Sequence, residues 1–324
     1  MKEWLLAISI FSVICFQVKG STGVKKIPSE NPLFQQNLKR AIELCDWAFE
    51  VHFHTDGMKM ARFFNPKTQR RSDETGSIWM YTSAIEAVNA ILRALQLEKE
   101  FGLGVLYEKH YDRYHNRLNL LYDNIDYYLG TFRLTSYTQT QNWSVYGVHR
   151  SSMKGTAKVA GIENVYDDHM WLIREYLQSY KITGQSEFLE RAEYLTAYVL
   201  DGWDCSIDED GNEVGGIPWG PGYVTKHACS NGPMVSPLVW LSEIYRVKED
   251  EVEYRYIDPK DRQTRRVEKM NKSDYYLMFA KKIYDWQKRS LLIEEGVYAD
   301  MMGGCYPSNP ETEKVNGQTL YSQV

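Results

Sequence analysis

Residues 166–201, YDDHMWLIREYLQSYKITGQSEFLERAEYLTAYVLD, decide the fold of this chain. Apolar residues recur every three or four positions on both sides of the pair Thr183-Gly184, which is the spacing of amphipathic helices. The stretch therefore predicts an αα-hairpin, two helices joined by a short turn. Its apolar positions are Ile173, Tyr176, Leu177 and Tyr180 before the turn, and Phe188, Leu189, Ala192 and Leu195 after it.

The same hairpin pattern recurs later, where apolar residues within 238–245 and 276–283 flank a charged insertion at about 248–272. Repeated αα-hairpins build solenoids and α/α toroids, and strand alternation is hard to find. We therefore predict an all-α fold in which segments near 131–165 and 202–227 are loops at the open end of a toroid. The expected helices span about 31–53, 77–99, 104–130, 166–182, 186–201, 228–247 and 273–289.

The composition favours a folded protein that does not bind nucleic acid. Of its 324 residues 43% are hydrophobic, which is enough for a substantial core, and the net charge is −5 without a basic cluster. Aromatic residues make up 14% of the chain, including 24 Tyr and 9 Trp. Such a surplus suits a carbohydrate binder, because aromatic rings stack on sugars, but large helical domains also use these residues in their cores.

The N-terminus has the pattern of an export signal. Lys2 precedes an apolar run over 4–18, and Gly20 with Val18 before it forms a small-residue cleavage pattern. The run is short for a bilayer span, so no integral membrane segment is expected. We predict a signal peptide over 1–20 and a secreted, periplasmic or cell-surface protein. A lipid anchor at Cys15 is less favoured, because such sites prefer a smaller residue than the preceding Ile.

The main candidate site is the segment NVYDDHMW, residues 164–171, where a loop becomes a helix. Asp167 and Asp168 lie there at the positive end of the helix dipole, and aromatic residues flank them. Two neighbouring acids can merely cap a helix. They can also serve a glycosidase, because like charges raise one pKa and make that group an acid, and a short separation favours a retaining mechanism.

A second cluster combines DGWD at 201–204, GGIPW at 215–219 and KHACSNG at 226–232. Trp219 lies in a Gly/Pro-rich loop and could stack on a sugar, or it could plug the loop against the helices. Asn231 could offer an amide to sugar hydroxyls, or it could cap a helix. The seven histidines form no convincing metal set, and no cofactor is expected. His169 fits a hydrogen-bonding neighbour of the acids as well as a ligand.

Together, these motifs and the pattern LxxYxxTGxxxFLxxA resemble family 76 of the glycoside hydrolases over roughly residues 75–290. The resemblance implies an (α/α)₆ toroid that acts as an endo-α-1,6-mannanase with retention of configuration and has α-mannan as its partner. It places the nucleophile at Asp167 and the general acid/base at Asp168. It implies substrate contacts from Asn164, Tyr166, Trp171, Trp219 and Asn231.

The chain departs from that family in its number of helices. Residues 21–324 account for about seven of the twelve helices of such a toroid, so we expect a catalytic domain that is incomplete at its C-terminus. Two alternatives therefore stay open: a mannan-binding or decayed relative without turnover, and an α/α-toroid enzyme that acts on another sugar. A monomer is expected.

Overall fold

The αα-hairpin expected over residues 166–201 is present as α5 (Tyr166–Thr183) and α6 (Ser186–Asp201) in a computed structural model, which describes residues 32–294 and 296–302. Gly184 ends α5 with a φ of 73°, in the left-handed region that glycine adopts readily, and its N–H donates to the Tyr180 carbonyl over 2.8 Å. Most of the predicted apolar face is buried, with Ile173 and Leu177 at 0% exposure.

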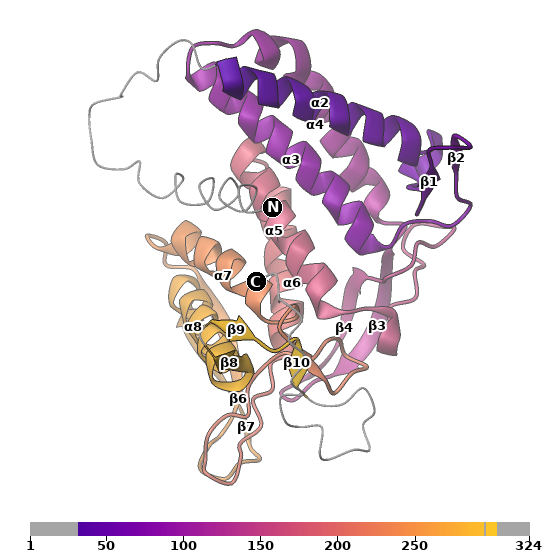
Figure 1. Cartoon of the computed structure of the whole chain (residues 1–324). Helices are drawn as coiled ribbons and strands as arrows, with labels where there is room; N and C mark the ends of the chain where they lie inside the picture. The colour runs from indigo at the N-terminus through magenta and orange to yellow at the C-terminus, as the bar shows by residue number, and fades with distance from the viewer. Residues whose placement is uncertain (1–31, 295, 303–324) are drawn as a thin grey trace.

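The described residues contain seven α-helices, each within a few residues of its predicted range except where strands intervene. They pair as α3 with α4, α5 with α6 and α7 with α8, and α3, α5 and α7 also pack side by side (Figure 1). With α2 packed on α3, the helices form an arc of an α/α toroid. The remaining helices are α2 (Pro32–His52), α3 (Ile78–Glu100), α4 (Val105–Ile125), α7 (Gly232–Tyr245) and α8 (Lys272–Leu291).

Two antiparallel hairpins occupy segments for which the sequence predicted no strands. The helix expected to reach residue 130 ends at Ile125, and β3 (Leu129–Thr135) and β4 (Thr140–Tyr146) occupy part of the expected loop. The charged insertion forms β6 (Glu251–Ile257) and β7 (Arg265–Asn271). Both hairpins extend beyond the helices at the lower end of the molecule in Figure 1. The remaining short strands are β1 (Phe64–Asn65), β2 (Arg70–Arg71), β5 (Lys226–His227), β8 (Leu292–Glu294), β9 (Val297–Tyr298) and β10 (Met301–Met302).

The β3–β4 hairpin is fixed by aromatic and polar contacts with α6. Trp143 of β4 is 4% exposed and meets the rings of Tyr194 and Tyr198 edge-on, at centroid distances of 5.5 and 5.3 Å. Arg191 of α6 donates to the Ser144 carbonyl over 3.1 Å. Helical periodicity cannot reveal this hairpin, because its stability depends on a helix that lies some fifty residues farther along the chain.

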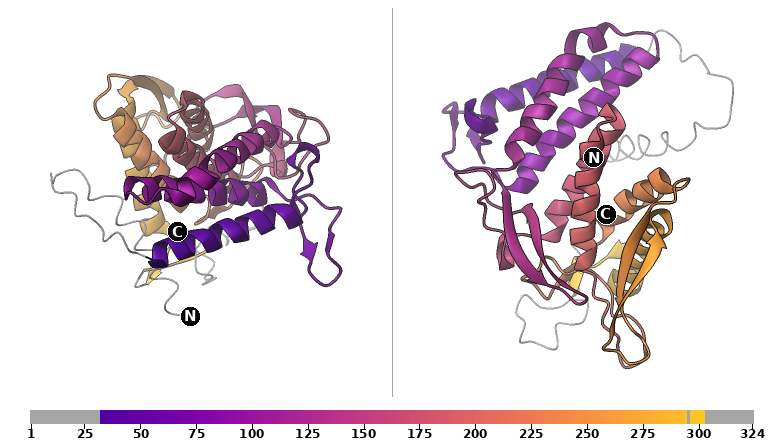
Figure 2. Two further views of the ribbon diagram at one scale, coloured as in Figure 1. Left: turned by 90° about the horizontal axis from the view of Figure 1, so that it is seen from above. Right: turned by 180° about the vertical axis from the view of Figure 1, so that it is seen from behind.

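The β6–β7 hairpin runs back toward the β3–β4 turn. Near its tip, Arg265 donates to the carbonyl of Tyr137, and Arg262 donates to that of Glu209, over 2.9 and 3.0 Å respectively. Figure 2, from behind, shows both hairpins at the same end of the helices. The long connections are therefore gathered at this end, as the sequence predicted, although they include strands.

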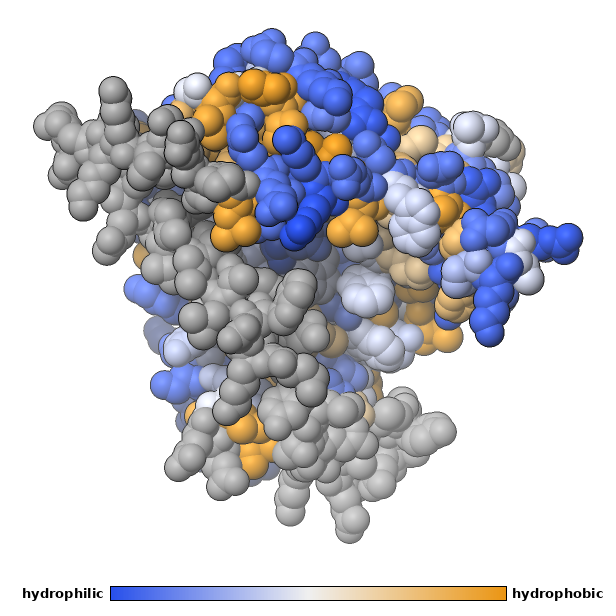
Figure 3. Space-filling view, turned by 45° about the horizontal axis from the view of Figure 1, so that its top comes forward, coloured by the Kyte–Doolittle hydropathy of each residue, from blue (hydrophilic) through white to orange (hydrophobic). Residues whose placement is uncertain are grey.

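The edge of the arc carries exposed apolar residues. Leu33, Leu44 and Trp47 of α2 are 60%, 66% and 53% exposed. Figure 3 shows hydrophobic patches among the mainly hydrophilic residues in the upper part of the molecule. The predicted signal peptide, with Cys15, lies outside the described residues. None of the helices in the described part of the chain has both the length and the apolar character that a membrane span requires.

Candidate active site

The first turns of α3 and α5 open into one cleft with a volume of about 400 Å³. Asp167 and Asp168 both line it, although neighbouring residues leave a helix about 100° apart. In a first turn both directions still reach the cleft, because no preceding turn of helix covers either side chain. The other lining residues are Ser77, Trp79, Val148, His149, Ile162, Glu163, Val165, Trp219 and Tyr223.

Asp167 is the acid that receives hydrogen bonds. Its Oδ2 accepts from Trp219 Nε1 over 3.3 Å and its Oδ1 from the Asp168 backbone N–H over 3.1 Å, and the Cys229 thiol lies beside it. Burial raises the pKa of Asp167, whereas the donors from Trp219 and Cys229 lower it. The donors thus partly offset the cost of desolvating this carboxylate.

Asp168 has a different environment. It is 8% exposed, and burial raises its pKa well above the usual range, with a further increase from the neighbouring Asp167 charge. Among the described residues, no side chain donates a hydrogen bond to its carboxyl group. The pair is therefore asymmetric: burial raises the pKa of both acids, but Asp168 retains its proton more readily than Asp167.

The wall opposite α3 is a loop that is held closely against the start of α5. The Tyr166 N–H donates to the Trp219 carbonyl over 2.7 Å. A Cβ on Gly220 would lie 2.5 Å from the Asn164 carbonyl oxygen, and one on Gly222 would lie 2.5 Å from the carbonyl carbon of Gly161. Only glycine permits this approach, which brings the Trp219 indole to Asp167.

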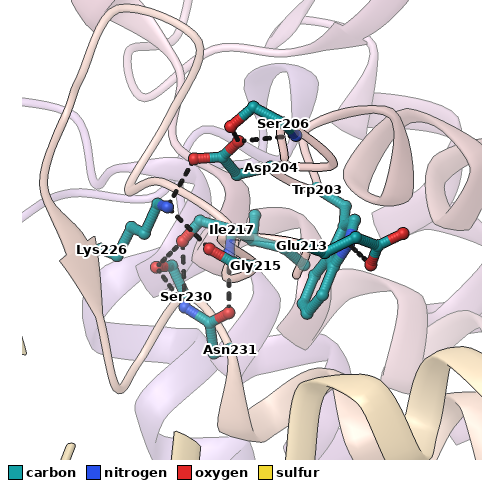
Figure 4. Close-up of polar contacts among 9 residues, drawn as sticks. All are labelled: Trp203, Asp204, Ser206, Glu213, Gly215, Ile217, Lys226, Ser230 and Asn231. Atoms are coloured by element: carbon teal, nitrogen blue, oxygen red, sulfur yellow. Dashed lines mark hydrogen bonds and ion pairs between the residues drawn. The ribbon is translucent and has the colours of Figure 1, made fainter. Parts of the chain in front are cut away.

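Asn231 and a buried ion pair fix the base of this loop (Figure 4). The Asn231 amide accepts from the Ile217 N–H over 2.8 Å and donates to the Ile217 carbonyl over 2.9 Å. Lys226 Nζ lies 2.7 Å from Asp204 Oδ2 and donates to the Gly215 carbonyl over 2.6 Å. These contacts satisfy the polar groups of a buried loop, so the path of the loop is well defined.

Of the five predicted substrate contacts, only Trp219 lines the cleft. Asn164 and Asn231 are 0% exposed, and their amides are bonded within the protein. The expected contact with a sugar is therefore replaced by support of the surrounding loops. Tyr166 is 2% exposed and lines a neighbouring cavity, and Trp171 packs under the Arg174 guanidinium outside the cleft.

His169 is a hydrogen-bonding neighbour, the first of the two roles considered for it. Its Nδ1 bonds the Val165 carbonyl over 2.8 Å, and its Nε2 accepts from the Tyr146 N–H over 3.0 Å. This pairing requires the neutral ring with its proton on Nδ1. Burial lowers the pKa of His169 to about 4, so the ring connects β4 to the start of α5 without a charge.

Trp79, His149, Glu163 and Tyr223 line the cleft, although none of them was predicted as a site residue. Trp79 carried a usable signal. The buried stripe of its helix includes Tyr81 and Ile85, so Trp79 falls off that stripe, and it is 58% exposed. A large aromatic residue outside the buried face, in the first turn of a helix, is a candidate for ligand contact.

The fold and the cleft define an α/α-toroid protein with a buried pair of acids, and solved structures share this fold. No protein-family model matches the sequence, and no curated protein matches it. A mannosidase of glycoside hydrolase family 76 from Bacteroides thetaiotaomicron VPI-5482 aligns with a TM-score of 0.57 at 17% identity, covering 89% of this chain. A family 76 glycoside hydrolase from a bovine Bacteroides thetaiotaomicron strain gives a TM-score of 0.54 at 17% identity over 86% of this chain. The chain thus has the fold of family 76 enzymes.

A different sugar enzyme also shares the fold. A D-mannose isomerase aligns with a TM-score of 0.50 at 14% identity, over 83% of this chain and 59% of its own. The chain covers 62% and 46% of the two family 76 structures, so it spans only part of their length. At these identities the likeness concerns the fold, and the chemistry must be argued from the cleft.

Proposed function

We propose that the chain belongs to glycoside hydrolase family 76 and cleaves α-1,6-mannan backbones with retention of configuration. The observation that carries the proposal is the asymmetric acid pair in the cleft. A retaining glycosidase needs one ionised carboxylate as nucleophile and one protonated carboxyl as acid, and Asp167 gives up its proton more readily than Asp168.

In the first step, Asp167 attacks the anomeric carbon and forms a glycosyl ester. The bond from that carbon to the leaving sugar breaks, and the proton of Asp168 goes to the leaving oxygen. In the second step, the Asp168 carboxylate takes a proton from water, the water oxygen attacks the anomeric carbon, and the ester bond to Asp167 breaks. Both carboxyl groups return to their starting states, and two inversions give net retention.

The fold and the aromatic residues of the cleft support a carbohydrate substrate. Trp79 comes from α3, whereas Trp219 and Tyr223 come from the facing loop, and the two loop rings lie 4.8 Å apart. Aromatic rings bind the apolar faces of sugars, and their N–H and O–H groups reach sugar hydroxyls. Because a family 76 mannosidase shares the fold, a mannan is the polymer to test first.

The decisive assay measures the release of manno-oligosaccharides from linear α-1,6-mannan, with the anomeric configuration of the first product determined by NMR. We expect release with retention, and we expect Asp167→Asn to abolish it while circular dichroism stays unchanged. Binding of mannan without release by the wild type would indicate a non-catalytic binding protein and refute the proposed hydrolysis. A large fall in thermal stability of Asp167→Asn would indicate that Asp167 mainly caps α5.

An α/α-toroid enzyme that acts on another sugar is the second candidate, supported by the fold match to D-mannose isomerase. The cleft also contains His149, an exposed imidazole of the kind that can transfer protons between sugar carbon atoms. Isomerisation of D-mannose that depends on His149, without hydrolysis of mannan, would favour this candidate.

The N-terminal sequence also bears on where the protein acts. We propose that it is exported by the signal peptide over residues 1–20 and acts outside the cytoplasm as a monomer. Loss of the peptide in the secreted protein, measured by mass spectrometry of its N-terminus, and the mass of the protein in solution would check both points.

A further inference from the structure

A second cavity of about 310 Å³ lies directly beside the cleft, because Tyr223 lines both. Its walls come from four places: the end of β3 with the β3–β4 turn, the first residue of α5, the C-terminal end of α6, and the loop at 218–223. We call it the turn pocket. We propose that the turn pocket binds a further neutral sugar unit of the same substrate chain, an inference that rests on the proposed function.

The shape and surface of the turn pocket suit a sugar ring. Its volume is at the lower end of the range of about 300–1,000 Å³ for small-molecule sites, so it can accept a sugar ring but not a folded segment or a polymer. The rings of Tyr137 and Tyr223 and the side chains of Pro218 and Pro221 give it flat apolar faces. Flat apolar faces beside hydrogen-bonding groups are what pyranose recognition needs.

The charge of the turn pocket favours a neutral ligand over an anion. Asp201 is the one charged side chain among the lining residues that the structure describes. Its Oδ1 is held by the Ser136 hydroxyl over 2.8 Å and by Gln139 Nε2 over 2.9 Å. Its Oδ2 is buried without a hydrogen-bond partner among the described residues, so Asp201 acts on a ligand through its charge, which repels a phosphate or carboxylate but not a neutral sugar.

Arg265 braces the turn from outside the pocket. Its Nε donates to the Tyr137 carbonyl over 2.9 Å, so the β6–β7 hairpin fixes the position of the β3–β4 turn. A pocket wall that is held in place loses little conformational entropy on binding. The β3–β4 hairpin therefore forms part of the pocket wall, and the β6–β7 hairpin supports that wall from outside.

The pocket is linked to the acids through two neighbouring segments. Tyr166, which forms part of its wall, directly precedes Asp167 in the first turn of α5. Trp219, which donates to Asp167, follows Pro218 of the pocket wall. A substrate chain that passes over Tyr223 can thus occupy the cleft and the turn pocket at once.

The test compares a long with a short linear α-1,6-manno-oligosaccharide, using the ratio of their kcat/KM values. Tyr137→Ala should lower the long-to-short ratio about tenfold, the loss expected for a stacked ring. Tyr137→Phe keeps the ring and should restore most of the ratio. Tyr284→Ala removes an exposed tyrosine of α8, 51% exposed, and should leave the ratio at the wild-type value.

A second variant guards against a misfolded Tyr137→Ala protein. Thr135 is exposed at the end of β3 and lines the turn pocket, and Thr135→Arg places a long side chain beside Asp201. This variant should lower the same ratio. A wild-type ratio in either folded variant overturns the turn-pocket proposal, whereas an absence of hydrolysis by the wild-type protein instead refutes the proposed function.

Discussion

Replacing Trp219 by Phe tests the assignment of the nucleophile. The change removes the indole N–H that donates to Asp167 Oδ2 over 3.3 Å, but it keeps an aromatic ring. That ring can still pack against Tyr223 and His227, whose centroids lie 4.8 and 5.0 Å from the Trp219 ring. The main loss is therefore one hydrogen bond to the ionised form of Asp167.

The size and sign of the effect follow from that bond. Hydrogen bonds to charged groups contribute about 1.5–3 kcal/mol, and a bond of 3.3 Å belongs at the low end of that range. Its loss should raise the pKa of Asp167 by about 1 unit, because 1.36 kcal/mol corresponds to one unit. Asp167 acts as a nucleophile only when ionised, so the variant should lose activity at acidic pH and approach the wild type as the pH rises.

The assay is the pH dependence of kcat/KM on α-1,6-mannan, which reports the ionisation of the free enzyme. The acidic limb of the variant should lie about 1 pH unit higher. Trp203→Phe is the matched control, because Trp203 Nε1 donates to a carboxylate away from the cleft, that of Glu213, over 3.1 Å. The role given to Asp167 would be refuted by an unshifted limb in Trp219→Phe, or by an equal shift in Trp203→Phe.

Three further changes have defined outcomes. Trp79→Ala should raise KM about fivefold to tenfold with little change in kcat, because it removes a ring that lines the cleft and is 58% exposed. Trp47→Ala removes a ring of α2 that is 53% exposed and should leave KM unchanged. If the two variants had the same KM, Trp79 would be excluded from substrate binding. Burial raises the pKa of Glu175 to about 7 from 4.5, so the wild type should lose up to about 3 kcal/mol of stability as the pH rises through that interval. Glu175→Gln should therefore be more stable than the wild type in urea unfolding at pH 8 and similar at pH 4; a constant difference between these pH values would contradict the raised pKa. Burial lowers the pKa of His169 from 6.5 to about 4 in the folded protein. The neutral ring therefore contributes its full share of the free energy of unfolding above pH 6.5, and this share should fall by about 3 kcal/mol as the pH drops toward 4. His169→Gln should remove that part of the pH dependence, and an unchanged unfolding profile would show that the ring does not carry it.

The predicted helices were accurate because each has its own buried stripe. The boundaries of α5 and α6 agree with the predicted ranges within one residue. Ser77 was predicted to begin a helix, and it caps α3 by accepting from the Met80 N–H over 3.4 Å. These signals are local, since residues three or four positions apart share a helix face whatever the rest of the chain does.

The strands were not predicted because the residues that bury them are distant in the chain or because their faces are polar. Most inward-facing residues of β3 are only half-buried, β6 is largely half-buried, and β7 is mostly exposed. Their pairing places Glu253 opposite Lys269 and charged residues opposite Tyr254 and Tyr256, and a pattern based on hydrophobicity treats such a segment as a solvated insertion. The charged composition of 248–272 was recognised, but its hairpin structure was not.

The sequence by itself determined the repeated αα-hairpins and placed Asp167 and Asp168 in a helical first turn, because both depend on short-range periodicity. The tertiary structure decided how the acids differ. Trp219 is 52 residues from Asp167 in the chain, and it reaches the carboxyl group only because the glycine-rich loop packs closely against the start of α5. The same folding turned Asn164 and Asn231 inward and brought Trp79 to the cleft. The path of a loop depends on the sum of many weak contacts between distant residues, and no local pattern encodes that sum.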